Sequence, residues 1–326
     1  MKTFSTPARP PARAPARPWA DIGSFALIGL SWGSTWLVIK DQVSLAPVGW
    51  TVTFRFALAA AGMFALALLR RERLWLGRRG LALASLAGVL QFCANYQFVY
   101  RGERFVTSGL VAVIYALLMV PNALLGRLVT GARASGRFWL GSGVAMAGIG
   151  LLLLNEVQAA RSAGAAALGI GFALLGMLCA SVSNVAQSLP EVRRHGLLAF
   201  TGWAMLAGML ADAAFAIATD GAPTWPVQWR YWGGVGWLAV VGSVLTFPVY
   251  YRLILRLGAG RAAYVNVVTP VVAMALSTLV EGYRWGPLTV AGSLLAMAGM
   301  LGALYRRSPA ADRPAQIAAS PSRQEG

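Results

Sequence analysis

The stretch GSGVAMAG at residues 141–148 recurs 151 residues later as GSLLAMAG at residues 292–299. The same shift, with no gap, places Gly131 on Gly282. Both stretches lie within long apolar segments, so the match indicates that one membrane-type unit occurs twice in this chain of 326 residues. The sequence therefore predicts a fold of two related halves.

The composition is that of a membrane protein. Hydrophobic residues make up 57 % of the chain and charged residues 12 %, whereas about a quarter of the residues in a soluble domain are charged. Apolar runs of about 18 residues or more recur along the chain, and such runs are typical of transmembrane helices. We expect an all-α, polytopic membrane protein. Its ten predicted spans are residues 22–40, 47–69, 80–100, 106–127, 137–155, 166–188, 198–218, 231–253, 262–281 and 286–305.

The net charge of +17 reflects membrane orientation rather than nucleic-acid binding. The basic residues sit in short clusters between apolar runs, not in a separate basic domain. Of the 28 Lys and Arg residues, 21 fall in the linkers of one side, six in those of the other, and Arg55 within a span. Positive residues stay in the cytoplasm, so this asymmetry predicts an inner-membrane protein with both termini cytoplasmic.

Two halves of five helices each must enter the membrane from opposite sides, because five is odd. Such inverted repeats are typical of secondary transporters, whose binding site lies near the midplane where the halves meet. We expect the first repeat at residues 21–157 and the second at residues 164–305. The ends, residues 1–20 and 306–326, have too little apolar surface to fold and are expected to be disordered cytoplasmic tails.

Polar side chains lie at membrane depth in the first and sixth spans. Polar groups exposed to lipid cost free energy, so these residues should face protein or a water-filled cavity. The alternative is that small residues let helices pack closely while their hydroxyls bond to backbone carbonyls. In these two spans, the residues predicted to line the substrate path are Trp32, Ser34, Thr35, Trp36, Asn184 and Gln187.

Arg55, in TVTFRFALAA, is the basic residue placed within a span. An arginine at a helix centre costs about 3 kcal/mol on insertion scales, so it needs a counter-charge, carbonyls or water. Two interpretations stay open. Arg55 attracts an anionic or carboxylate-bearing substrate, or it clamps helices together and extends toward the outer face.

Further polar residues and two prolines interrupt the third, fourth and ninth spans. Gln91 and Asn95 are four residues apart and share a helix face. A proline removes one backbone hydrogen bond and kinks a helix, so Pro121 and Pro270 are predicted hinges. The other candidates for the substrate path in these spans are Gln91, Asn95, Tyr115, Tyr264 and Asn266.

Acidic residues are scarce in the spans. Asp212 lies in the seventh and Glu281 at the outer end of the ninth. Proton-coupled carriers need a titratable carboxylate in the path, so both are candidate coupling residues. For Glu281, an interfacial pair with Arg284 is the alternative.

The order of several short motifs resembles the EamA family of the drug/metabolite transporter superfamily, from residue 22 to residue 305. The resemblance implies two inverted five-helix domains around a central cavity lined by the first, third, fourth, sixth, eighth and ninth helices. It also implies carriage of small metabolites such as amino acids, often as export. One position departs from the family pattern, because Thr130 stands where the second half has Glu281. The motifs are WGSTW (32–36), RF (55–56), TSGLVAV (107–113), VPNAL (120–124), LGAGRAAYVN (257–266) and EGYRW (281–285).

Other functions fit less well. An intramembrane enzyme needs His or Cys ligands or a Ser–His pair at membrane depth, and the one histidine, His195, lies in a linker. The two cysteines lack CxxC spacing, so we expect no metal and no cofactor. A lipid or polyprenyl-carrier translocator stays open. We expect a secondary transporter of a small molecule, not an enzyme, working by alternating access in the bilayer as a monomer or weak homodimer, with no nucleic-acid partner.

Overall fold

The computed structural model describes residues 18–131, 134–159, 162–187, 189, 191–257 and 265–304. Within these ranges all regular secondary structure is helical and there is no strand. Residues 1–17 and 306–326 of the predicted tails lie outside the described residues. The first helix begins at Pro18, so the last three residues assigned to the N-terminal tail are helical instead.

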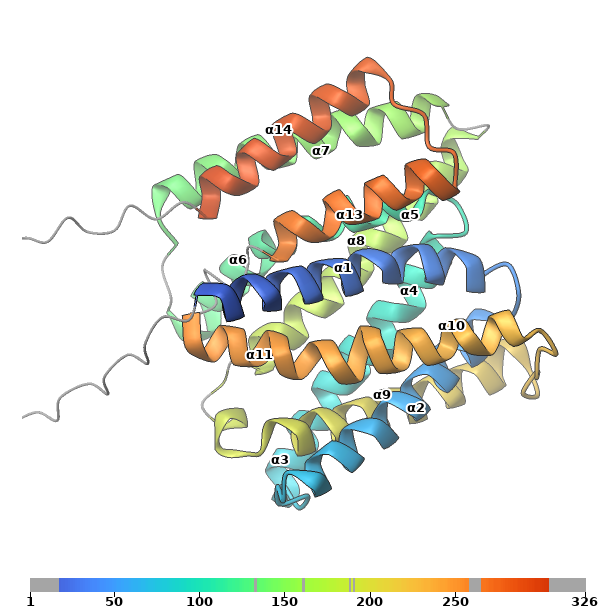
Figure 1. The fold of residues 1–326 in the computed structure, drawn as a ribbon, viewed down its shortest axis with the longest axis vertical. Helices are drawn as coiled ribbons and strands as arrows, with labels where there is room; N and C mark the ends of the chain where they lie inside the picture. Colours follow the sequence, from blue (N-terminus) through green and yellow to red (C-terminus); the bar gives the residue numbers. More distant parts are fainter. Residues whose placement is uncertain are drawn as a thin grey trace, which may run out of the picture.

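The helices are joined by short connections and lie roughly alongside one another (Figure 1). Two of them, η1 and η3, are π-helical turns, and η2 is a 3₁₀ turn. In chain order the elements are α1 (Pro18–Gln42), α2 (Val48–Leu69), α3 (Gly77–Gly88), η1 (Val89–Ala94), α4 (Asn95–Gly102), α5 (Ser108–Ala116), α6 (Met119–Thr130), α7 (Gly136–Ala159), α8 (Ala163–Gln187), η2 (Val192–Arg194), α9 (Leu197–Asp220), α10 (Trp229–Ala239), η3 (Val240–Leu245), α11 (Thr246–Leu257), α13 (Val265–Val280) and α14 (Pro287–Leu304).

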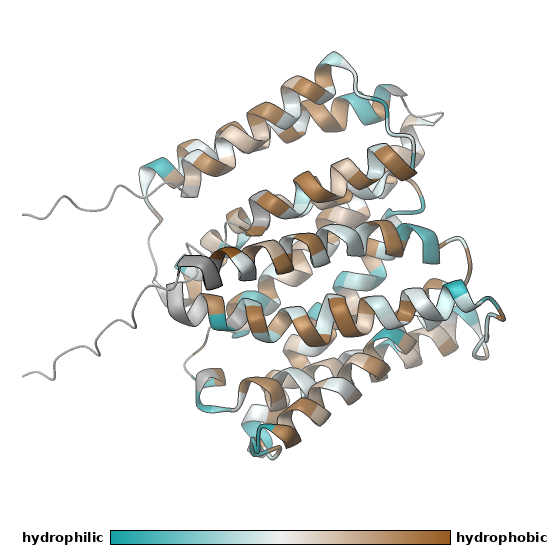
Figure 2. Ribbon diagram, in the orientation of Figure 1, coloured by the Kyte–Doolittle hydropathy of each residue, from teal (hydrophilic) through white to brown (hydrophobic). Residues whose placement is uncertain are grey.

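The helices are suited to a bilayer. Eight segments of the described chain are long and apolar enough to cross a membrane, and Val268–Val280 and Pro287–Ala303 are shorter apolar helices. Apolar colour runs along the helices and hydrophilic colour gathers at their ends (Figure 2). Large apolar side chains also face outward, including Leu128 at 81 % exposure and Leu279 at 81 %. A surface of this kind requires lipid around it, so the chain is a polytopic membrane protein.

The two π-helical turns occupy matching places in the two halves. The turn Val89–Ala94 separates α3 from α4, and the turn Val240–Leu245 separates α10 from α11. The two turns differ by the same 151 residues, 89 to 240 and 94 to 245, as the repeated sequence stretches. Gly131 and Gly282 share the offset and both have a left-handed backbone, with φ of 69° and 68°, which favours glycine.

The repeated AMAG segments pack against each other. Helices α7 and α14 run antiparallel, and a Cβ atom at Gly148 would overlap the backbone of Ala296. Likewise, a Cβ at Gly299 would overlap the backbone of Ala145. Shifting either contact by 151 residues reproduces the other, since 145 maps to 296 and 148 to 299. Small residues therefore allow two membrane helices to approach at backbone distance.

Helices α1 and α8 lie at the centre of the fold. Helix α1 packs against α13, α11, α10 and α5, and α8 packs against α4, η1, α6 and α5. Helices α2 and α9 pack against each other and run antiparallel. The amide of Gly49 donates to Asp220 Oδ2 at 3.0 Å, while at the other end of the pair Gly202 packs against Phe64. The central pair is thus enclosed by elements from both halves of the sequence.

The fourth span is broken before its proline. Helix α5 ends at Ala116 and α6 begins at Met119, and the carbonyl of Leu117 accepts a tight-turn bond from Val120 N at 2.8 Å. Pro121 is the third residue of α6, a position where a missing N–H costs little. Pro270, in contrast, lies inside α13.

Candidate functional site

A cavity of about 130 Å³ lies between α1, α2, η1, α4, α5, α8, α11 and α13. One water molecule needs about 10–15 Å³ on the same measure, so the cavity has room for several waters or a small organic molecule. Its lining comes from the six spans that the family resemblance implies, with Arg55 added from the second span. The lining residues are Trp32, Thr35, Trp36, Ile39, Arg55, Gln91, Asn95, Tyr96, Val99, Ala112, Tyr115, Ala116, Leu118, Ala180, Asn184, Phe247, Tyr250, Thr269 and Pro270.

The structure brings most of the predicted path residues to this one cavity. Those on its wall are Trp32, Thr35, Trp36, Arg55, Gln91, Asn95, Tyr115, Asn184 and Pro270. The predicted residues that do not line it are Ser34, Pro121, Gln187, Asp212 and Glu281. Tyr264 lies outside the described residues, as does the side chain of Asn266.

Trp32 joins the first span to the π-helical turn of the eighth. Its indole N–H donates to the carbonyl of Gly242 at 3.2 Å and to Thr246 Oγ1 at 3.1 Å. Its ring packs on Phe247 and Tyr250, with centroid distances of 5.7 and 5.0 Å. Trp32 therefore forms an aromatic wall shared by α1 and α11.

The hydroxyl groups of the first span donate hydrogen bonds to carbonyl groups of their own helix. Thr35 donates to the carbonyl of Trp32 at 2.7 Å, and Ser34 donates to that of Ser31 at 2.8 Å. Ser34 Oγ also accepts from the indole of Trp237 at 3.2 Å. The packing interpretation therefore describes Ser34, whereas Thr35 both packs and lines the cavity.

Arg55 is a buried cation without a counter-ion. Its side chain is 1 % exposed, and Nη1 and Nη2 donate to the phenol oxygens of Tyr100 and Tyr96 at 3.3 and 3.4 Å. The guanidinium carbon lies 4.4 Å from the centre of the Tyr96 ring and 5.2 Å from that of Phe56. In the described part of the chain no carboxylate oxygen lies within 4.0 Å of it. Aromatic faces thus hold the charge in the cavity wall and leave it electrically unbalanced.

Four lining residues carry buried polar atoms that have no hydrogen-bond partner among the residues described. They are the donors Trp36 Nε1 and Arg55 Nε, the acceptor Gln91 Oε1, and the hydroxyl Thr269 Oγ1. An unpaired buried polar group costs about 1–3 kcal/mol, so such a group calls for a water or a ligand. Three of the four come from the first half and Thr269 comes from the second.

Asn95 orders the polar face of the first π-helical turn. Its amide Nδ2 donates to the carbonyl of Gln91 at 3.1 Å, and its Oδ1 accepts from the hydroxyl of Tyr115. The Tyr115 ring packs in turn on Trp36 at a centroid distance of 5.0 Å. Helices α4, α5 and α1 are therefore connected through one small polar and aromatic group.

The predicted residues away from the cavity have partners of their own. Gln187 Nε2 donates to Ser183 Oγ one turn earlier at 3.1 Å. Asp212 Oδ1 accepts from Gln97 Nε2 at 2.8 Å. Each of these bonds gives its side chain a role in packing.

Glu281 receives two bonds from the first residue of α5. Its Oε2 accepts from Ser108 Oγ at 2.5 Å, and its Oε1 from the amide of Ser108 at 3.4 Å. The Glu281–Arg284 pair considered from the sequence is not among the ion pairs of the described residues. Glu281 therefore ties the end of α13 to the start of α5.

The sequence analysis did not identify three aromatic residues of the cavity wall, nor one buried acidic residue close to it in the chain. Tyr96, Phe247 and Tyr250 complete the cavity wall. Each follows a π-helical turn within a few residues, and a π-helical turn has no clear sequence pattern. Glu103 falls in the linker between the predicted spans 80–100 and 106–127, yet its side chain is 0 % exposed.

Comparison with known proteins points in one direction. A family model described as the EamA-like transporter family matches residues 21–154 and 167–305. Protein PagO of Salmonella typhimurium (strain LT2) is 24 % identical over 270 residues, covering 79 % of this chain and 84 % of PagO. The uncharacterized inner membrane transporter YedA of Escherichia coli (strain K12) is 28 % identical over 261 residues, covering 80 % of this chain and 82 % of YedA.

A solved structure shares the fold. It superposes with a TM-score of 0.65 at 18 % sequence identity, covering 88 % of this chain and 98 % of the other. At this identity the likeness concerns the helical architecture alone.

Proposed function

The chain belongs to the EamA-like transporter family, and on that premise we propose that it moves an amino acid or a related small metabolite by alternating access. Membership makes the protein a membrane transporter rather than an enzyme. YedA is described as an inner membrane transporter, and we place this chain in the inner membrane as well. The excess of basic residues in alternate linkers supports cytoplasmic termini.

Alternating access needs two halves that can exchange their roles. We propose ten membrane helices arranged as two inverted repeats of five. The antiparallel pair α7 and α14 supports this, since its glycine contacts exchange under the 151-residue shift. The matching turns Val89–Ala94 and Val240–Leu245 give independent support. In an inverted arrangement the substrate site lies where the halves meet, which is where the cavity is.

The proposed substrate class rests on the polar atoms of the cavity wall that have no hydrogen-bond partner among the described residues. Arg55 offers a positive charge with no counter-ion, and Trp36 offers an unpaired N–H donor. Together they suit a carboxylate, which accepts hydrogen bonds and carries the missing negative charge. Gln91 Oε1 and Thr269 Oγ1 can accept from an amine. This combination of groups is that of an amino acid.

The remaining assignments are also proposals. Pro270, inside α13 and on the cavity wall, is a hinge where the helix bends as the cavity opens, and Pro121 follows the break in the fourth span. Asp212 and Glu281 are candidate coupling carboxylates. Asp212 accepts a hydrogen bond from Gln97 and Glu281 accepts one from the hydroxyl of Ser108.

Uptake into proteoliposomes tests the proposed function. The purified chain is reconstituted, and entry of a panel of radiolabelled L-amino acids is compared with movement of a fluorescent phospholipid. We expect saturable uptake of at least one amino acid, and loss of that uptake in Arg55→Gln. As a matched control, Arg104→Gln removes a positive charge that lies outside the cavity. Phospholipid movement without amino acid uptake would contradict the proposal and favour a lipid translocator.

A further inference from the structure

Glu103 is a buried acidic residue that no part of the proposed mechanism uses. It lies in the short connection between α4 and α5, four residues after Val99 of the cavity wall. Its side chain is 0 % exposed. Neither carboxyl oxygen has a hydrogen-bond partner in the described part of the chain. A buried ionised carboxylate without partners is strongly unfavourable, whereas the neutral acid is tolerated far better.

Charged groups of three elements act on this carboxyl group. Lys40 comes from α1, Arg55 from α2 and Glu281 from the end of α13. Burial raises the pKa of Glu103 well above its ordinary value and the neighbouring Glu281 also raises it, while Lys40 and Arg55 act in the opposite direction. The phenols of Tyr100 and Tyr115 lie within reach of its charge.

Lys40 is near Glu103 but does not bond to its carboxyl group. The ammonium donates instead to the backbone carbonyls of Glu103 and Val106, the latter at 2.8 Å. This arrangement ties α1 to the connection that follows α4. The acid is therefore surrounded by charge yet has no hydrogen bond that would stabilise its ionised form.

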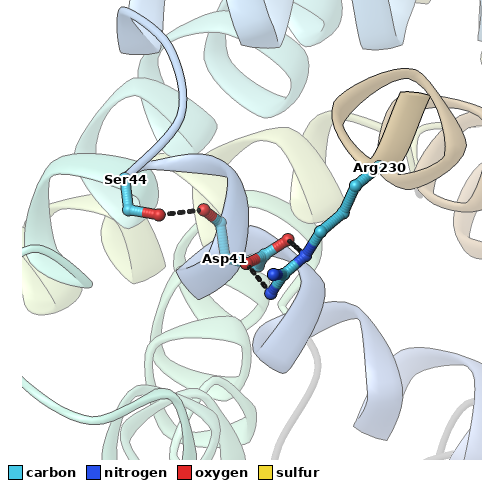
Figure 3. A network of polar contacts seen from close by, with 3 residues as sticks. All are labelled: Asp41, Ser44 and Arg230. Atoms are coloured by element: carbon cyan, nitrogen blue, oxygen red, sulfur yellow. Dashed lines mark hydrogen bonds and ion pairs between the residues drawn. The ribbon is translucent and has the colours of Figure 1, made fainter. Parts of the chain in front are cut away.

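Further contacts link the helices at this end of the molecule. Arg230 of α10 forms an ion pair with Asp41 of α1, and Ser44 donates to the Asp41 carbonyl at 2.7 Å (Figure 3). Glu281 connects the end of α13 to Ser108 of α5. These contacts join α1, α5, α10 and α13, and Lys40, Asp41, Arg230 and Glu281 line an open pocket at this end. The side chain of Glu103 itself is 0 % exposed.

We propose that Glu103 is the proton-binding group of this transporter, carrying a proton while its side chain is buried and releasing it to water when the helices around it separate. On release the O–H bond of the carboxyl group breaks and the proton passes to a water molecule. The resulting carboxylate then bonds to the Lys40 ammonium, which has left the carbonyls. Uptake is the reverse of these steps.

The proton on Glu103 links to the proposed substrate through Arg55. When Glu103 is ionised, its negative charge offsets that of Arg55 and competes with a substrate carboxylate. When Glu103 is neutral, Arg55 is left free to attract the anion. Proton binding and substrate binding therefore favour each other, and by thermodynamic linkage the effect is reciprocal. This inference rests on the proposed transport function for its coupling, although not for the protonation itself.

Glu103 differs in this respect from the other acidic candidates. Asp212 accepts a bond from Gln97 at Oδ1, although its Oδ2 is unpaired among the described residues, and Glu281 accepts two bonds from Ser108. Both oxygens of Glu103 are unpaired. Among these three acids it is therefore the one with neither carboxyl oxygen hydrogen bonded to a described residue.

Infrared spectroscopy tests the protonation without any substrate. Spectra of the protein in lipid nanodiscs are recorded between about pH 5 and about pH 8. We expect a protonated-carboxyl component in the wild type that is absent from Glu103→Gln. The component should persist in Glu281→Gln and in Glu191→Gln, which alters a partly exposed acid at the other end of the fold. Identical spectra for the wild type and Glu103→Gln would overturn the proposal.

A transport assay tests the coupling. Proteoliposomes receive a mixture of radiolabelled L-amino acids under an imposed proton gradient. The wild type is expected to accumulate label about fivefold or more above equilibration, and Glu103→Gln to equilibrate without accumulating. Glu103→Asp, which keeps a titratable group, should retain part of the accumulation. Accumulation by Glu103→Gln, or accumulation driven by a sodium gradient, would overturn it. A wild type that moves no amino acid would contradict the proposed function, while the infrared result would still decide the state of Glu103.

Discussion

The guanidinium group of Arg55 lies over the ring of Tyr96, with its central carbon 4.4 Å from the ring centre. An arginine at membrane depth is usually balanced by an acidic residue, whereas here phenol oxygens and ring faces hold it. This relationship explains how the cavity wall can carry a permanent positive charge. It also favours arginine over lysine, because lysine offers a compact charge without a planar face.

Two substitutions of Arg55 should distinguish the effect of its positive charge from the effect of its planar shape. In Arg55→Lys the charge remains but stacking on Tyr96 and the paired phenol bonds are lost, so we expect substrate affinity to fall about tenfold, or about 1.4 kcal/mol. In Arg55→Gln the charge is lost and uptake should be abolished. Uptake kinetics in proteoliposomes measure both effects. If Arg55→Gln melts far below the wild type and Arg55→Lys transports normally, then Arg55 acts as a helix clamp.

Asn184 and Gln187 form a matched pair one helical turn apart on α8. Asn184 lines the cavity, whereas Gln187 donates to Ser183. We expect Asn184→Leu to reduce uptake strongly with little change in melting temperature. Gln187→Leu should leave uptake largely intact and cost about 1 kcal/mol of stability through its lost hydrogen bond. Equal loss of uptake in both variants, measured at equal protein levels, would contradict this distinction.

The contact between α7 and α14 should be intolerant of added side-chain volume. In Gly148→Val the new side chain would overlap the backbone of Ala296, and the helices would have to separate. We expect a loss of about 1–3 kcal/mol, typical of overpacking, seen as a lower melting temperature in detergent.

Gly143 provides the control for this experiment. It lies on the same helix, and no atom lies within 4 Å of a Cβ placed on it. Gly143→Ala should therefore be neutral or stabilising by up to about 1 kcal/mol. A Cβ alone at Gly148 would already overlap Ala296, so equal destabilisation by Gly148→Ala and Gly143→Ala would show that the close approach of the helices does not matter.

Much of the architecture was predictable because membrane insertion imposes a simple pattern. Apolar runs predicted the apolar helices, eight of which are long enough to cross a membrane in the described chain. The 151-residue repeat predicted that the segments beginning at Gly141 and Gly292 were related. Their direct packing was not predictable, since a repeat indicates similarity and not contact. The π-helical turns were also missed, because one extra residue in a helical turn changes neither composition nor hydropathy.

The candidate site, like the fold, could be predicted only in part from the sequence. Spacing placed Gln91 and Asn95 on one face, and both line the cavity. It placed Gln187 beside Asn184, yet Gln187 bonds along its own helix instead. Glu103 could not be recognised from sequence, because a linker acid is normally solvated and its burial depends on how Lys40 and Val106 meet in three dimensions.

The stability of the protein should fall as the pH rises, in part because of Glu103. Its pKa lies well above the ordinary value of 4.5, mainly through burial. Above pH 4.5 the unfolded chain has lost this proton while the folded chain retains it, so the folded state binds more protons. Stability then decreases with increasing pH until the folded carboxyl group has also ionised. Below pH 4.5 the group makes no contribution to the pH dependence of stability.

Melting temperatures measured from about pH 5 to about pH 8 should therefore fall less steeply in Glu103→Gln than in the wild type. Glu191→Gln should follow the wild type, and a Glu103→Gln curve parallel to the wild type would show that Glu103 is ionised in the folded protein.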